Sequence, residues 1–144
     1  EQLLSSVDYF QVTLQDLMNI PLSPYNLKIN DIGIDYTNTI TVTGTTVDII
    51  WSSRNRFNLN GSDALNPNLI NDDYDFDSFE LEIYHTTVGN FTIVSANLLN
   101  TIIQSTKSYT YTFAGYSYFL IRIRQKNTTG KYSNWSSVTL IHKI

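Results

Sequence analysis

Several residue types are absent or scarce in this sequence, and each absence narrows the kinds of protein that it can encode. The 144 residues include no cysteine, which excludes disulfides and thiolate metal sites. Apolar runs are short and broken by Thr, Asn or Arg, so we expect no membrane insertion. Charged residues make up only 15% of the chain and apolar residues 42%, a composition that fits one globular domain with its own core.

The sequence also lacks the motifs that usually accompany catalysis. It has no Gly-x-Ser-x-Gly elbow, no glycine-rich phosphate loop and no His-Glu-x-x-His pair. His85 and His142 are its two histidines, and a lone surface histidine is far commoner than a general base. We therefore predict that the protein is not an enzyme and needs no cofactor.

One acidic stretch, "DDYDFDSFE", is the best candidate for a metal site. Asp73, Asp75 and Asp77 have the spacing with which calcium loops begin. Ser78 and Tyr84 stand where an EF-hand needs a glycine and a bidentate glutamate, so that motif fails. We predict no metal here and a solvated loop whose charge keeps an exposed edge soluble.

The pattern that dominates the chain is alternation of apolar and polar residues, rich in aromatic and β-branched side chains. Such alternation predicts strands, and polar turn-prone stretches separate the segments. About seven short strands without a strong helical stretch predict an all-β, antiparallel β-sandwich. The predicted strands cover residues 25–29, 39–44, 46–51, 79–84, 109–113, 118–124 and 137–144.

The first twenty residues differ from the rest, because they mix helical and strand patterns and end near Pro21 and Pro24. We interpret residues 1–20 as a lead-in or the remnant of a preceding domain, and residues 21–144 as the sandwich. The chain begins at Glu1, which suggests a piece of a longer polypeptide.

The predicted sandwich resembles a fibronectin type III domain. Trp51 closes an alternating strand where that family keeps a buried tryptophan, and "FELEIY" has the spacing of its third strand, strand C. "FLIRIRQKNTTG", from Phe119 to Gly130, is similar to its sixth strand, strand F, with phenylalanine in place of the usual tyrosine. The resemblance implies a fibronectin type III-like, immunoglobulin-like sandwich with Trp51 and Phe119 as structural residues.

A narrower resemblance bears on function. "WSSRNRF", the acidic stretch and "IRIRQKNTTGKYS" resemble the fibronectin-like segment of phage tail-tip and host-specificity proteins, also found in gene transfer agents. Trp51, Arg54, Arg56 and Gln125 fit that pattern, while Ser53 replaces an arginine. The resemblance implies a non-enzymatic structural or adhesion module of a tail tip or baseplate, located in the virion. Its partners would be other tail or parent-chain domains and a host-surface protein or glycan.

The long loop at residues 54–75 and the turn at residues 127–134 should lie at one end of the sandwich, where loops commonly carry function. The candidate binding residues at this end are Arg54, Arg56, Tyr132 and Asn134. Two other interpretations stay open. One is a fibronectin type III accessory or adhesin module of a bacterial secreted protein, extracellular and binding polysaccharide or protein. The other is a receptor ectodomain, because "YSNWSS" resembles the Trp-Ser-x-Trp-Ser box of cytokine receptors.

Charge is distributed unevenly along the chain. Residues 1–100 carry three Lys/Arg and thirteen Asp/Glu, whereas residues 101–144 carry six Lys/Arg and no acidic residue. Strands C and F are neighbours in a type III sandwich, so Glu80 and Glu82 should form exposed cross-strand pairs with Arg122 and Arg124. The basic half would then serve internal pairing, and we predict no nucleic-acid binding.

Trp135 lies in a Ser/Asn-rich turn just before the last predicted strand. Counting by twos from Val138 and Leu140, which should face the core, places Trp135 on the outer face. Arg122 and Arg124 occupy the outer face of the adjoining strand. We predict that Trp135 makes a cation–π contact with one of these arginines and acts as a structural brace.

Overall fold

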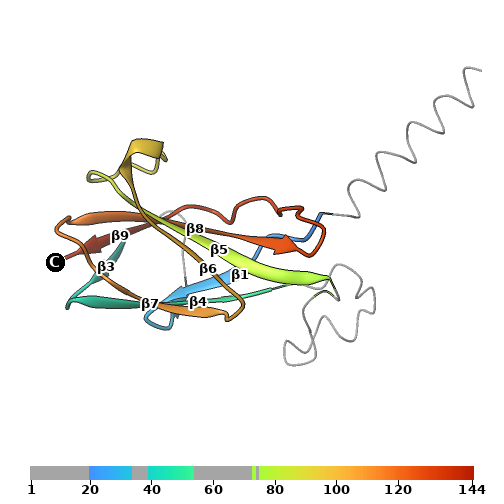
Figure 1. The fold of residues 1–144 in the computed structure, drawn as a ribbon. Coiled ribbons are helices and arrows are strands. Elements are labelled where there is room, and N and C mark those ends of the chain that lie inside the picture. The colour runs from blue at the N-terminus through green and yellow to red at the C-terminus, as the bar shows by residue number, and fades with distance from the viewer. Residues whose placement is uncertain (1–19, 34–38, 54–72, 74) are drawn as a thin grey trace, which may run out of the picture.

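The computed structural model describes residues 20–33, 39–53, 73 and 75–144. These residues form two β-sheets that pack face to face (Figure 1). One short 3₁₀ helix, η2 (Ser95–Asn97), lies between two strands, and no helix in the described ranges is long and apolar enough to cross a membrane. The all-β sandwich predicted from alternation is confirmed.

The first sheet has the strand order β2-β1-β4-β7, and all its pairings are antiparallel. The second sheet has the order β3-β9-β8-β5-β6, antiparallel except for the parallel pair β3–β9. The strands of the first sheet are β1 (Tyr25–Ile29), β2 (Ile32–Gly33), β4 (Thr46–Ser52) and β7 (Ser108–Thr112). Those of the second are β3 (Ile40–Val42), β5 (Phe76–His85), β6 (Leu98–Gln104), β8 (Tyr118–Asn127) and β9 (Thr139–Lys143).

Each of the seven predicted segments overlaps one of these strands. The prediction missed β2, which has only two residues, and β6, whose sequence "LLNTIIQ" does not alternate. Asn30 and Asp31 form the tight turn between β1 and β2, and both have a positive φ. The predicted lead-in, residues 1–20, lies outside the described residues apart from Ile20.

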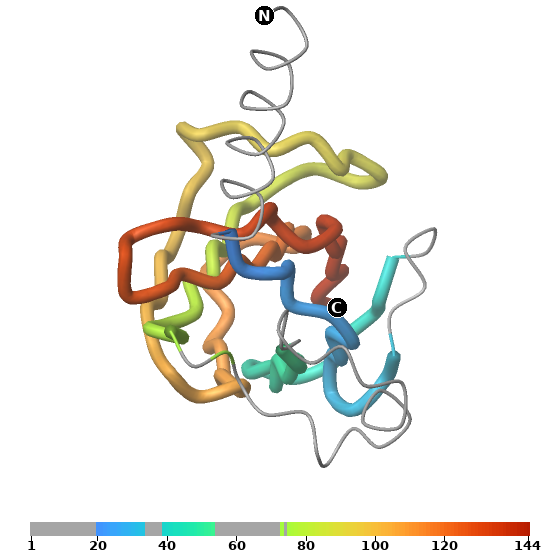
Figure 2. The backbone as a smooth tube through the Cα atoms, turned by 90° about the vertical axis from the view of Figure 1, so that its right-hand side faces the viewer, coloured from blue at the N-terminus to red at the C-terminus, as the bar shows by residue number. Residues whose placement is uncertain are grey.

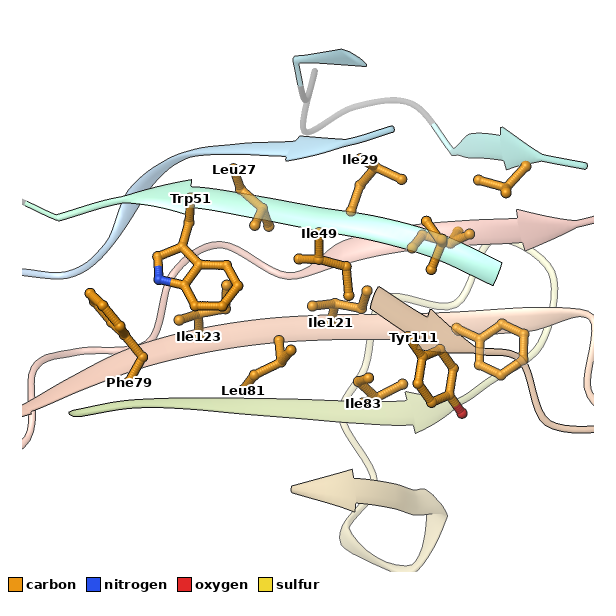
Figure 3. Close-up of a cluster of buried hydrophobic side chains, with 14 residues drawn as sticks. Leu27, Ile29, Ile49, Trp51, Phe79, Leu81, Ile83, Tyr111, Ile121 and Ile123 are labelled. Atoms are coloured by element: carbon orange, nitrogen blue, oxygen red, sulfur yellow. The ribbon is translucent and has the colours of Figure 1, made fainter. Parts of the chain in front are cut away.

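The main core fills the space between the two sheets (Figure 3). Trp51 is 2% exposed and meets Phe79 edge-on, with ring centroids 5.5 Å apart. Phe119 is fully buried at the other end of the core, beside Tyr111. Alternation along β5 and β8 supplies the inner face of the second sheet with Phe79, Leu81, Ile83, Phe119, Ile121 and Ile123, as predicted.

A second, smaller apolar cluster lies on the opposite, outer face of the second sheet. Tyr84, Leu120 and Leu140 are its buried members, and Val138 packs against them. The prediction that Val138 and Leu140 face the main core is therefore wrong. Leu140 pairs with Leu120 on the outer face. The residues of β9 that face inward are therefore Thr139 and Ile141, on either side of Leu140.

The outer cluster should matter to stability as much as the main core does. Leu120→Ala is expected to lower the free energy of unfolding by about 2–5 kcal/mol, like Ile121→Ala on the inner face. Urea unfolding of both variants measures this. A Leu120→Ala cost within about 0.5 kcal/mol of zero, as for an exposed site, would contradict the burial of this cluster.

Candidate binding surface on the outer face of the second sheet

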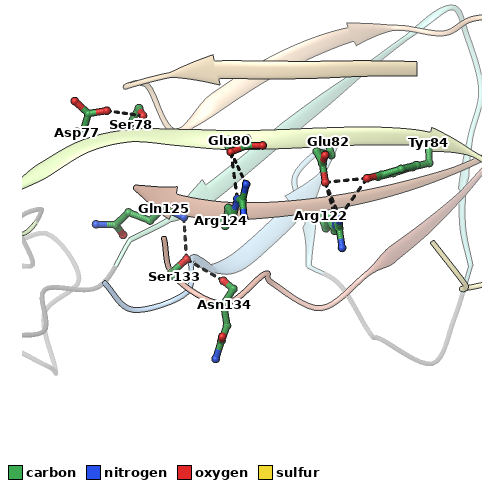
Figure 4. A network of polar contacts seen from close by, with 10 residues as sticks. All are labelled: Asp77, Ser78, Glu80, Glu82, Tyr84, Arg122, Arg124, Gln125, Ser133 and Asn134. Carbon is green, nitrogen blue, oxygen red and sulfur yellow. Dashed lines mark hydrogen bonds and ion pairs between the residues drawn. The ribbon is translucent and has the colours of Figure 1, made fainter. Parts of the chain in front are cut away.

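The charged residues of β5 and β8 stand opposite one another on the outer face of the second sheet. Glu80 is directly across from Arg124, and Glu82 from Arg122. The closest N–O distances are 3.0 Å for Arg124–Glu80 and 2.7 Å for Arg122–Glu82 (Figure 4). The predicted cross-strand pairing is confirmed, although these side chains are only 12–26% exposed and so lie deeper than surface ion pairs.

The pair formed by Glu82 and Arg122 includes a tyrosine hydroxyl. Tyr84 donates a hydrogen bond of 2.9 Å to Glu82 Oε1 and accepts one of 3.2 Å from Arg122 Nη2. Burial raises the pKa of the Tyr84 hydroxyl, and the hydrogen bond to Glu82 raises it further. Tyr84 therefore stays protonated, and continues to donate to Glu82, throughout the neutral pH range.

Aromatic rings and guanidinium groups alternate over this ion-paired surface. The guanidinium carbons of Arg122 and Arg124 lie 4.0 and 4.3 Å from the centroid of Trp135. Arg124 also lies 3.8 Å from the ring of Tyr132, and Arg122 5.5 Å from the ring of Tyr84. These five residues form what we term the arginine–aromatic stack. The cation–π contact predicted for Trp135 is present, and it involves both arginines.

Two serines place the aromatic residues of the stack. Ser133 N–H donates to the carbonyl of Gln125, and Ser133 Oγ accepts from the amide of Gln125. Ser136 makes the same two bonds with Ile123, at 2.7 and 3.0 Å. In each contact the serine hydroxyl accepts the hydrogen bond from β8 that a backbone carbonyl would accept in a regular sheet. The two serines thus hold residues 133–136 against β8. This arrangement has a three-residue repeat, so Tyr132 and Trp135, each preceding a serine, both reach the outer face.

The turn that leads into this segment is organised by Asn127, whose side chain is 1% exposed. Its Oδ1 accepts hydrogen bonds from the backbone amides of Thr129 and Lys131, at 3.2 and 2.9 Å. Gly130 takes a φ of 85°, a region that disfavours residues with a Cβ. The Asn-x-x-Gly pattern therefore fixes a single turn conformation.

The acidic stretch meets this turn. Thr128 N–H donates to the Asp75 carbonyl at 2.8 Å, and Asn127 Nδ2 lies 3.4 Å from Asp75 Oδ2. These contacts confirm that the end of the long connection after β4 adjoins the turn after β8. Asp73 is only 3% exposed, so the prediction that the whole stretch is a solvated loop is wrong at this residue. The described ranges contain no group of three or more His, Cys, Asp or Glu residues that could hold a metal ion.

The structure separates the four predicted binding residues. Arg54 and Arg56 lie outside the described residues. Tyr132 is 39% exposed but belongs to the arginine–aromatic stack, so its role is partly structural. Asn134 is exposed and its side chain points away from β8 in Figure 4, while its carbonyl accepts a bond of 2.8 Å from Ser23. A binding role for these residues stays a prediction.

The two histidines lie at the other end of β8 from the turn. His85 stacks on Tyr116, with ring centroids 4.1 Å apart and planes inclined by 3°. His142 stacks in the same way on Tyr118, at 4.4 Å. Each imidazole thus packs on an aromatic ring, which is a structural use of the side chain.

Comparison with known proteins leaves the family open. No family model matches the chain, and no curated protein matches it. Among solved structures, the extracellular domain of BT4673 from B. thetaiotaomicron matches with a TM-score of 0.46 and 14% identity. That match covers 86% of this chain but only 15% of the BT4673 chain. The PmoD soluble domain from Methylocystis sp. ATCC 49242 (Rockwell) matches with a TM-score of 0.43 and 8% identity, over 83% of this chain and 97% of that one. Similarity at this level carries no argument about function.

The arginine–aromatic stack predicts that Arg122 and Arg124 cannot be replaced by lysine. Arg124→Lys keeps the charge opposite Glu80 but loses the planar group between two rings. We expect a loss of about 1–2 kcal/mol in the free energy of unfolding, from two cation–π contacts. Lys126→Arg, two residues further along β8, is the matched control: it keeps the positive charge beside the Tyr132 ring and should change little. A fully stable Arg124→Lys variant in urea unfolding would show that charge alone suffices.

Gln125 offers a second test, because its side chain is completely buried. Within the part of the chain that the structure describes, neither of its amide atoms has a hydrogen-bond partner, and the same is true of the indole nitrogen of Trp51. A buried polar group without a partner costs about 1–3 kcal/mol. Gln125→Met keeps the length of the side chain and removes this cost, so it should leave the urea midpoint unchanged or raise it. A marked loss of stability would reveal a bound water or another partner for the amide.

Proposed function

We propose that the chain is a non-enzymatic β-sandwich module of a bacterial surface or secreted protein, and that it binds polysaccharide through the turn after β8. The observation that carries this proposal is the rigid presentation of the turn. Asn127 fixes its backbone on one side, and the arginine–aromatic stack fixes the segment that follows. A surface held in one conformation loses little entropy on binding.

The chemistry of the turn suits a sugar. Thr128, Thr129, Tyr132 and Asn134 are exposed there, and they offer hydroxyl groups, an amide and the edge of an aromatic ring. Such groups make the adaptable hydrogen bonds and low-entropy contacts on which polar recognition depends. The two glutamates of β5, Glu80 and Glu82, are each paired with an arginine, which leaves them unsuited to acid–base chemistry.

Depletion assays with a panel of insoluble polysaccharides test the proposal. We expect the 144-residue chain to bind at least one of them without cleaving it. Asn134→Ala should weaken binding about tenfold, the equivalent of one good hydrogen bond, with an unchanged urea midpoint. Thr43→Ala, which alters an exposed threonine near the opposite end, is the matched control. Failure to bind any polysaccharide, or equal loss in both variants, would reject this function.

The tail-tip interpretation remains a second proposal. Of the residues that fit its pattern, Trp51 and Gln125 are described, and both are buried at the end of the sandwich that carries the turn. Both proposals assign the chain a contact role without catalysis. The sequence of the parent gene distinguishes them, because tail domains beside this one would favour the virion and a surface anchor or catalytic domain would favour the secreted protein.

A further inference from the structure

One edge of the second sheet is formed by β6, which among the described strands pairs with β5 alone. Its seven residues, "LLNTIIQ", include no charge and no proline. A register shift against β5 places one bulge near its start, between Leu98 and Asn100, and the pairing is regular from Asn100 to Gln104. Ile103 is 68% exposed and Leu98 41% exposed. Edge strands usually carry a lysine, a proline or a bulge, or are very short, because their unpaired backbone groups otherwise recruit another strand.

The other edges of the described sheets are better protected. β2 and β3, at the ends of the two sheets, have two and three residues. β7, with five residues, exposes serine and threonine. β6 thus combines length, neutrality and apolar exposure in a way that the other described edges do not.

The apolar character continues into the connection before β6, which stands out from the two sheets in both views (Figures 1 and 2). Residues 86–106 include no charged side chain. Val88, Phe91 and Val94 in this connection are 74%, 38% and 44% exposed. An uncharged, partly apolar edge of this length is typical of a surface that meets another protein.

We infer that β6 pairs with β6 of a second copy of this chain, antiparallel about a two-fold axis, and joins the two five-stranded sheets into one. Charge favours a copy over a charged partner, because the nearest charges, Glu80 and Glu82, are already neutralised by arginine. A strand without charge can pair with a second copy of itself without repulsion between like charges. A two-fold contact of this kind uses the same edge of both copies, so neither β6 edge stays free. A register in which Asn100 of each copy faces Ile102 of the other, within the regular part of β6, places Thr101 on the axis.

The absence of cysteine makes a direct test possible. In an antiparallel pair, residues on the axis have Cα atoms about 4.5–5.5 Å apart, within the range that a disulfide spans. Thr101→Cys should therefore form a covalent dimer under mild oxidation. Thr112→Cys, which alters an exposed threonine at the end of the edge strand β7, is the control and should remain monomeric on a non-reducing gel. A crosslink at residue 112 but not at 101 would overturn the inference.

Light scattering after size exclusion supplies the second readout. The unmodified chain should approach twice its mass of 16.5 kDa as concentration rises. Thr101→Lys brings two like charges face to face on the axis and should return the chain to the monomer, whereas Thr112→Lys should not. Both sites are exposed, and urea midpoints verify that the variants fold. A monomer at every concentration, or a dimer that survives Thr101→Lys, would overturn the inference.

Discussion

The register between β5 and β8 is the constraint on which the rest of this surface depends. Pairing Leu81 with Ile123 sends one set of side chains into the core and the neighbouring set to the outer face. A shift by one residue would reverse every side chain, so the same register that buries the apolar residues also aligns the ion pairs. Arg122 and Arg124, two residues apart on the same face of β8, can then both contact the indole ring of Trp135.

The guanidinium groups have two kinds of neighbour, and both are needed to explain their burial. Each arginine bonds in the plane of its guanidinium to a glutamate on β5, and its flat face contacts an aromatic ring from the segment 132–135. Removing a charge from water is costly unless its hydrogen-bonding capacity is met. The glutamates accept hydrogen bonds at the edge of each guanidinium group, where its N–H donors lie. The aromatic rings cover its two faces, from which no N–H projects.

Much of the fold follows from the sequence because strand period is local. Alternation located the buried faces of β5 and β8. The ion pairs followed only with the expectation, taken from the resemblance to a type III sandwich, that these two strands are neighbours. The outer-face position of Trp135 was predicted correctly, but by a count of alternate residues that does not apply there. Residues 133–136 are held by the two serine contacts, and β9 begins only at Thr139. β6 was missed because a register shift between Leu98 and Asn100 interrupts its alternation, so that Leu99 and Ile102, three residues apart, both pack against the main core. The burial of Asp73 was missed because an acidic run predicts solvent exposure for all of its members alike.

The uneven charge of the chain has a structural explanation in these contacts. Two of the six basic residues after position 100 neutralise glutamates that lie forty residues or more earlier in the chain. Pairing distant segments with opposite charges favours the correct neighbour for β8, because two acidic or two basic strands side by side would repel each other. It also leaves the centre of the sheet without net charge. The polar character of the module is then concentrated at the turn after β8, and its neutral character at β6, so two different kinds of contact can be made at two separate places.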